Sequence, residues 1–263
     1  MNPTLPQVSI IVRTHQRPTL LERTLWSLCH QKYQDFEVIV VEDGPPLSQN
    51  RVGSFDSLNI NYIFTGEQVG RARAGNVGLS NSRGIYLNFL DDDDLLMPDH
   101  VLKMVGILAN NKNIDAVHAA SIEKKMDILS LDPLEVSVFG PKVKYNRPFN
   151  HERIFFENMF PIQAVMFRRT LFEQYGGMDE SLELLEDWDL WIKYSMYAKF
   201  RYVDTTTSIY HIPKDQKMLR DRHNELKRYE RVIAKKYRDY IQDKGYSPAS
   251  KVTKLIEKWQ GLF

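Results

Sequence analysis

Short apolar runs alternate with amphipathic segments along the first third of the chain. Residues 8–12 and 36–41 are rich in Val and Ile, which is typical of parallel strands buried on both faces. Residues 61–64 form a weaker apolar run, and 85–90 is again mostly apolar. We therefore predict four strands within about the first 95 residues.

The segments between these runs have the spacing of helices. Pro18 stands at a first helical position, and the residues that follow on one helical face are Leu20, Leu21, Thr24, Leu25 and Leu28. Further helices are predicted over about 72–82 and after Pro98. Alternating strands and helices predict a doubly wound α/β sheet, in which ligands bind beyond the carboxyl ends of the strands.

The second half of the chain is less regular. Residues 116–120 and 207–210 predict two further strands. Between them, 121–161 mixes polar and apolar residues with several prolines. We expect hairpins and long loops there, lying over the ligand-binding edge of the sheet.

Polar residues follow the predicted strands at that edge, and the most unusual are the four consecutive carboxylates of Asp91–Asp94. Four buried carboxylates cannot all stay ionised without a cation, because like charges raise one another's pKa. Mg²⁺ or Mn²⁺ would resolve this conflict, and such ions complete their shells with water and substrate phosphates. A solvated acidic loop is the alternative, although the apolar residues 86–90 argue against it. A calcium hand fits less well, because the run lacks its glycine turn and closing glutamate.

Composition excludes several classes of protein. Of the 263 residues 43% are hydrophobic and 26% are charged, which is neither a disordered nor a fibrous composition. No apolar run approaches the roughly 18 residues of a membrane span, and no signal peptide is recognisable, so we expect a cytoplasmic protein. The single cysteine, Cys29, excludes an internal disulfide. Neither a glycine-rich dinucleotide motif nor a P-loop lysine is present, which argues against dinucleotide redox chemistry and ATP hydrolysis.

The net charge of +1 hides an asymmetry along the chain. Residues 214–263 hold fourteen basic and seven acidic side chains, so the rest of the chain is acidic. Apolar residues also recur there at helical spacing, among them Leu226, Ile233 and Tyr237. A basic amphipathic helix can lie on an anionic membrane. It can equally pack its apolar face onto the catalytic domain, and both interpretations stay open.

Six motifs, in this order, resemble the family 2 glycosyltransferases. They are Val8–Val12, Val40–Gly44, Gly70–Gly78, Gly84–Asp94, Gly176–Glu180 and Glu186–Trp191. The resemblance covers about residues 7–213. It implies an α/β fold of the GT-A type, in which a Rossmann-like, mostly parallel sheet is flanked by helices. It also implies a GT-A domain over 1–213, with a nucleotide-binding half over about 1–120 and an acceptor-binding half over about 121–213. Residues 214–263 are then a basic helical C-terminal extension.

Position by position, the resemblance implies a donor site. Asp43 corresponds to the acid that recognises the nucleobase, and Asp91 begins the metal-binding Asp-x-Asp motif. Four aspartates in a row leave its register open by one, and the spacing to Pro98 favours Asp93 on the metal and Asp92 near the ribose. The residues implied to contact the donor are Thr14, His15, Arg17, Asp43, Arg71, Asn76, Asp91 and Asp92. Arg71 and Arg73 remain alternatives for the contact with the diphosphate.

The resemblance also implies a catalytic base and a third metal ligand. Asp187 corresponds to the aspartate of an acidic pair and would take the proton of the acceptor hydroxyl. The alternative is that Glu186 and Asp187 only favour a helix N-terminus. His211 would join Asp91 and Asp93 in binding Mn²⁺ or Mg²⁺, or else is a helix-flanking or core histidine. Trp191 is a sugar platform or, by its spacing, a core residue.

The expected function is inverting transfer of a sugar from a nucleoside-diphosphate sugar, UDP-linked in preference to GDP- or dTDP-linked. The acceptor is a hydroxyl of a glycan or lipid-linked molecule in cell-surface polysaccharide or glycoconjugate assembly. We expect no nucleic acid partner, and peripheral contact with the inner face of the membrane through 214–263. A nucleotidyltransferase and a non-catalytic protein that binds a sugar nucleotide or metal are the alternatives.

Overall fold

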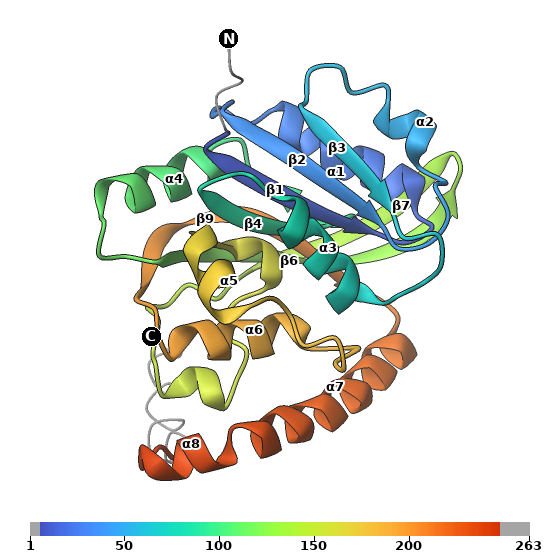
Figure 1. Ribbon diagram of the computed structural model, residues 1–263. Coiled ribbons are helices and arrows are strands. Elements are labelled where there is room, and N and C mark those ends of the chain that lie inside the picture. The colour runs from blue at the N-terminus through green and yellow to red at the C-terminus, as the bar shows by residue number, and fades with distance from the viewer. Residues whose placement is uncertain (1–5, 248–263) are drawn as a thin grey trace.

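The computed structural model describes residues 6–247 and contains a nine-stranded sheet. Its first four strands are parallel and lie in the order β3-β2-β1-β4 (Figure 1). They are β1 (Val8–Thr14), β2 (Phe36–Glu42), β3 (Ile60–Phe64) and β4 (Tyr86–Asp91). All four strands predicted from the apolar runs are therefore present.

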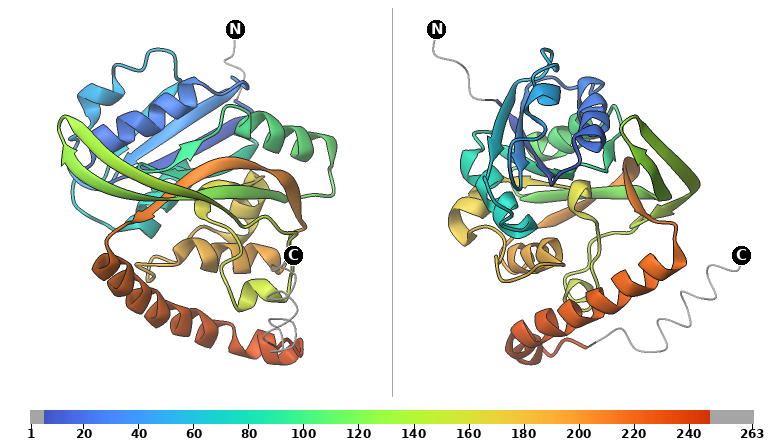
Figure 2. Two further views of the ribbon diagram at one scale, coloured as in Figure 1. Left: turned by 180° about the vertical axis from the view of Figure 1, so that it is seen from behind. Right: turned by 90° about the vertical axis from the view of Figure 1, so that its right-hand side faces the viewer.

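Five further strands extend the sheet beyond β4. They are β5 (Leu95–Leu96), β6 (Ala116–Leu131), β7 (Leu134–Lys144), β8 (Val165–Arg168) and β9 (Phe200–Pro213). β8 runs antiparallel to β4 and β6, while β9 runs parallel to β6. β6 is much longer than the predicted 116–120, because its second half pairs with β7 in a hairpin that projects from the body (Figure 2).

Helices cover both faces of this sheet, as predicted. They are α1 (Pro18–Cys29), α2 (Gln49–Val52), α3 (Arg71–Asn81), α4 (His100–Asn110), α5 (Arg169–Tyr175) and α6 (Glu186–Ser195), with 3-10 turns η1 (Arg153–Phe155) and η2 (Ile162–Ala164). Because side chains alternate along a strand, Val8, Ile10 and Val12 of β1 pack against α1 and α4. Ile11 faces the other way, toward α3 and α6. The α/β fold expected from the sequence is confirmed.

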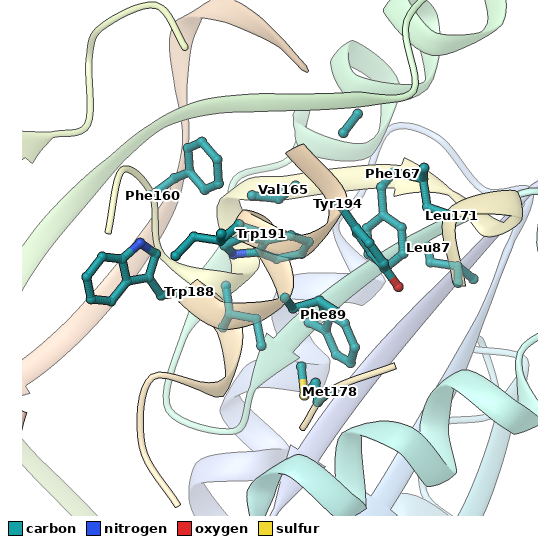
Figure 3. Packing of buried hydrophobic residues seen from close by; sticks show 14 of the residues in the cluster. Leu87, Phe89, Phe160, Val165, Phe167, Leu171, Met178, Trp188, Trp191 and Tyr194 are labelled. Carbon is teal, nitrogen blue, oxygen red and sulfur yellow. The ribbon is translucent and has the colours of Figure 1, made fainter. Parts of the chain in front are cut away.

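Helix α6 is held against the sheet by large aromatic side chains. Trp191 and Tyr194 are fully buried, and Trp191 packs edge-on against Phe167 of β8 with ring centroids 5.6 Å apart (Figure 3). Trp188 donates a 2.6 Å hydrogen bond from its indole nitrogen to the Ile154 carbonyl. Trp191 is therefore a core residue and does not present a platform for a sugar.

The C-terminal extension is helical, as predicted, over its described part. α7 (Gln216–Lys236) and α8 (Arg238–Asp243) run along one side of the body, beyond α6 (Figures 1 and 2). Ile233 and Tyr237 are buried in the core that contains α6. The remainder of the extension, 248–263, lies outside the described residues. None of the described helices combines the length and apolar character needed to cross a bilayer.

The glycine before β4 allows its backbone to lie directly on β1, and this generates a stability prediction. A Cβ at Gly84 would lie 2.4 Å from the Ser9 nitrogen and 2.6 Å from the Val8 carbonyl carbon, neither of which can move aside. We expect Gly84→Ala to lower the free energy of unfolding by about 3 kcal/mol in urea denaturation.

The control is Gly106→Ala in α4, where an added Cβ meets no atom within 4 Å. It should raise the free energy of unfolding by about 0.5–1 kcal/mol, because alanine is the better helix former. Equal unfolding midpoints for the two variants would contradict the close approach of β1 to Gly84.

Candidate active site

A cavity of about 770 Å³ lies at the carboxyl ends of β1, β2 and β4, the edge predicted to bind ligands. A volume of this size is within the range of sites that enclose small molecules and cofactors. The described residues that line it are Arg13, Thr14, His15, Arg17, Asp43, Gln68, Val69, Gly70, Arg71, Ala72, Ala74, Asp91, Glu180, Leu182 and Glu183. Three guanidinium groups therefore face a space bordered by carboxylates.

Arg13 and Asp43 are the most buried charged residues that line this cavity, each only 6% exposed. The Arg13 guanidinium donates to Asp91 Oδ1 through Nη2 at 2.7 Å and Nε at 2.9 Å, and to Glu186 Oε1 at 2.8 Å. Burial opposes ionisation of Asp91, but the charges of Arg13 and Arg71 outweigh it and lower the pKa of that carboxyl. One arginine therefore ties the end of β4 to the first turn of α6.

Asp92 turns away from the cavity, which differs from the ribose contact expected for it. Its side chain is fully buried, and it accepts hydrogen bonds from Thr14 Oγ1 at 2.7 Å and from Arg17. Burial raises the pKa of Asp92 to about 7, although Arg17 opposes the rise. Asp92 lies in the turn that follows β4, and these hydrogen bonds direct its side chain toward the β1 loop. Asp92 therefore holds the β1 loop in place.

Asp43 lies at the end of β2 in the cavity wall, as expected for a residue that recognises a base. Its two carboxylate oxygens accept the backbone N–H groups of Val69, at 2.6 Å, and Gly70, at 3.0 Å. His15 contacts the Asp43 carbonyl through Nδ1. These bonds fix the segment that leads into α3 against the β1 loop, and so shape one side of the cavity.

At α3 the structure separates two residues that the resemblance grouped together. Arg71 lines the cavity whereas Arg73 does not, so Arg71 is the arginine available to an anionic ligand. Asn76 is not in the cavity wall. Its side chain donates to the Met178 carbonyl at 3.0 Å and accepts from the Met178 N–H at 2.7 Å. Asn76 therefore attaches the turn before α6 to α3, and its expected contact with the donor stays a prediction.

The implied metal ligands lie near one another in the chain's fold but are paired with cations. Asp91 is bound by Arg13, and Asp93 Oδ2 accepts from Arg17 at 3.0 Å. His211 Nδ1 lies 2.6 Å from the Asp93 carbonyl and Nε2 lies 3.0 Å from Arg23. Within residues 6–247, no three His, Cys, Asp or Glu side chains are arranged to hold a metal ion.

The chemistry of these donors nevertheless fits a divalent ion that is shared with a ligand. Asp91 Oδ2 and Asp93 Oδ1 accept no hydrogen bond from a described residue, so each carboxylate retains one oxygen. Mg²⁺ is commonly bound by one or two carboxylates together with substrate phosphates. Burial and then the charge of Arg23 lower the pKa of His211 to about 4, which keeps its imidazole neutral.

Asp187 follows Glu186 in the first turn of α6, on the side of Arg13 away from β4. Its Oδ1 accepts the Trp188 N–H at 2.7 Å, and its Oδ2 lies 3.3 Å from the Asn158 amide nitrogen. Burial and then the charge of Glu186 raise the pKa of Asp187 to about 6. A carboxylate with such a pKa can accept a proton near neutral pH.

Sequence reasoning missed the central role of Arg13. The signal was present, because an arginine at the end of a buried strand needs anionic partners. In the register of β1 with β4, Arg13 lies directly opposite Asp91. Gln68 and Val69, which also line the cavity, carry no comparable signal.

The Arg13 bridge generates a stability prediction. Arg13→Met leaves Glu186, 2% exposed, as an unpaired buried carboxylate. We expect a loss of about 3–5 kcal/mol in the free energy of unfolding, measured by urea denaturation at neutral pH. Adding Glu186→Gln to Arg13→Met should restore at least half of that loss, and strict additivity of the two changes would contradict the bridge.

Comparisons with known proteins agree with this architecture. The model of the family described as glycosyl transferase family 2 matches residues 9–176. An uncharacterized glycosyltransferase of Haemophilus influenzae is 30% identical over 195 residues, which are 71% of this chain and 61% of that protein. A second, from Methanocaldococcus jannaschii, is 25% identical over 85% of this chain and 77% of its own length.

Two solved structures share the fold at low sequence identity. S. aureus TarS 1-349 in complex with UDP-GlcNAc has a TM-score of 0.63 and 18% identity, covering 81% of this chain and 60% of that one. The mannosyltransferase PcManGT from Pyrobaculum calidifontis, in complex with GDP-Man and Mn²⁺, has a TM-score of 0.62 and 17% identity, covering 99% and 81%. The family match ends before α6, so Asp187 lies outside it. On the extent of that match, this chain belongs to glycosyltransferase family 2.

Proposed function

We propose that the protein transfers a sugar, with inversion at the anomeric carbon, from a nucleoside-diphosphate sugar to a hydroxyl acceptor. One observation carries the proposal. A cavity lined by three arginines is joined, through Arg13, to a helix whose first turn bears Asp187 with a pKa of about 6. Anion binding on one side and a proton acceptor on the other are what such a transfer requires.

Two sets of residues in the cavity would bind different parts of the donor. Asp43, His15 and Thr14 border the part between β1 and β2, where the nucleoside would lie. Arg17 and Arg71 line the same cavity and would face the diphosphate. UDP is our preferred nucleotide, and the TarS and PcManGT complexes hold UDP-GlcNAc and GDP-Man respectively.

Mn²⁺ or Mg²⁺ completes the proposed site. Asp91 and Asp93 would hold the ion through their free oxygens, with His211 nearby. When bound, the ion would neutralise charge on the leaving diphosphate. Arg13 would keep Asp91 ionised and correctly oriented for that purpose.

Asp187 would act as the general base. The acceptor oxygen attacks the anomeric carbon, the bond from that carbon to the diphosphate oxygen breaks, and the hydroxyl proton passes to Asp187. The Asn158 amide and the Trp188 N–H would hold its carboxylate in position. The alternative enzyme, a nucleotidyltransferase, would use an attacking phosphate, and Asp187 would then have no role as a base.

The acceptor and place of action are also part of the proposal. We propose a glycan or lipid-linked acceptor in cell-surface polysaccharide or glycoconjugate assembly, reached at the inner face of the membrane. The support is the positive charge of 214–263, which would favour peripheral contact with anionic lipid.

The metal is tested by thermal shift with UDP. We expect UDP to raise the unfolding temperature several degrees more in Mn²⁺ than in EDTA, because the diphosphate otherwise meets unshielded carboxylates. Asp93→Asn should remove most of that difference, whereas Asp56→Asn, on an exposed turn, should not. Equal shifts of the unfolding temperature in Mn²⁺ and in EDTA would contradict the metal site. If GDP shifts the unfolding temperature and UDP does not, GDP replaces UDP as the proposed nucleotide.

The base is tested by UDP release from a UDP-sugar, with water as the acceptor. Asp187→Asn should lower the rate by roughly two to four orders of magnitude while the UDP-induced thermal shift is unchanged. Since the base works only when ionised, the wild-type rate should rise with pH through about 6 and level off above it. A rate independent of pH between about 5 and 7 would contradict the assignment.

A further inference from the structure

Helix α7 has two faces with different surroundings. Ile233 is buried against the body, and Leu219, Leu226 and Tyr229 are half-buried on the same side. At about 100° per residue these positions lie within one third of the helix circumference. The inward face of α7 is therefore already occupied by the protein itself.

The outward face of α7 carries a stripe of positive charge. It consists of Lys217, Arg220, Lys227, Arg228, Arg231 and Lys235, all of which are exposed. Helical geometry confines these six to a sector of about 100° opposite the buried face. Asp221 and Glu225 lie beyond one edge of the sector, and Glu230 lies on the inward side, so no acid interrupts it.

These cations are not neutralised within the described structure, where the contact of Arg228 is with the Tyr229 ring, 5.8 Å from its centroid. None of the six forms an ion pair with a residue in 6–247, whereas the neighbouring Lys236 forms two. Lys236 Nζ lies 2.7 Å from Asp179 and 2.9 Å from Asp189. One lysine of the helix is therefore committed to the body, and the stripe remains available to a partner.

The same contacts fix the stripe relative to the active site. Asp189 is buried on α6, two residues after Asp187, and accepts hydrogen bonds from Lys236 and from Tyr237 at 3.0 Å. Tyr229 donates to Glu183, which lines the cavity, at 2.8 Å. A partner bound on the stripe would thus be held at a defined orientation to the cavity.

We propose that the outward face of α7 is a docking surface for an anionic lipid bilayer. Clusters of about four to eight Lys and Arg on one helix face are suited to acidic headgroups. The six residues of the stripe include no aromatic side chain, so the stripe offers no platform for stacking bases and is poorly suited to single-stranded nucleic acid. All three views show α7 at the margin of the molecule, where a flat surface can reach it (Figures 1 and 2).

Contact with the bilayer is electrostatic rather than by insertion. The apolar side of α7 faces the protein, and only Met218 and Val232 are strongly exposed among its large apolar residues, at 57% and 47%. Binding should therefore depend on acidic lipid and weaken as salt screens the charges. The docking surface rests on the membrane contact included in the proposed function but not on the sugar transfer, because it is tested by binding alone.

The experiment is co-sedimentation of the full chain with vesicles. We expect binding to vesicles of phosphatidylglycerol and phosphatidylcholine at low salt, and at least about tenfold weaker binding to pure phosphatidylcholine. The triple variant Lys227→Glu, Arg228→Glu, Arg231→Glu should lose at least about tenfold in affinity for the acidic vesicles. Its UDP-induced thermal shift, if one is seen in the wild type, should be unchanged.

The matched control reverses three exposed lysines elsewhere, Lys32→Glu, Lys112→Glu and Lys142→Glu, and so changes the net charge equally. It should bind acidic vesicles within about threefold of wild type. Equal loss in both triple variants would reduce the effect to net charge and overturn the docking surface. No binding by the wild type, or tighter binding to a DNA duplex than to acidic vesicles, would also overturn it.

Discussion

The buried guanidinium of Arg13 is the interaction on which the candidate site depends. It joins Asp91, at the end of a sheet strand, to Glu186, in the first turn of α6. Burying these groups costs several kcal/mol per charge, which only close pairing in good geometry can offset. The bridge thus fixes the start of the acidic run relative to Glu186, the residue before the proposed base. Loss of any one partner would disturb both parts of the site.

The acidic run is organised by a second arginine in a similar way. Arg17 binds Asp92 and Asp93, while Thr24 donates from its hydroxyl to the carbonyls of Asp92 and Asp94. Neighbouring carboxylates thereby differ in their surroundings, because Asp92 and Asp94 are buried whereas Asp91 lines the cavity. Arginines within the protein relieve part of the like-charge conflict noted in the sequence, but burial and then the charge of Asp93 still hold the pKa of Asp94 well above its usual range. A metal ion would add to this pairing.

The sequence predicted the sheet and its ligand-binding edge well, because apolar runs and strand-end polar residues are local signals. It could not predict contacts made across long separations. Asn76 lies 102 residues from its partner Met178, and Arg13 lies 173 residues from Glu186. A family motif shows that such residues belong to the site but not which way each side chain turns. The resemblance places Asn76 and Asp92 at the donor, and only the structure shows the bonds that their side chains make within the protein.

The C-terminal extension is a second case in which the sequence does not determine how side chains are arranged in space. Its sequence is both amphipathic and basic, and the two properties favour different interpretations, packing onto the body and binding to a membrane. In the structure they occupy opposite sides of α7, with Ile233 buried and the cations exposed. Packing onto the catalytic body therefore does not exclude a surface role. By fixing the inward side, Lys236 and Tyr237 give the outward charges a constant position relative to α6, which a freely moving tail would not have.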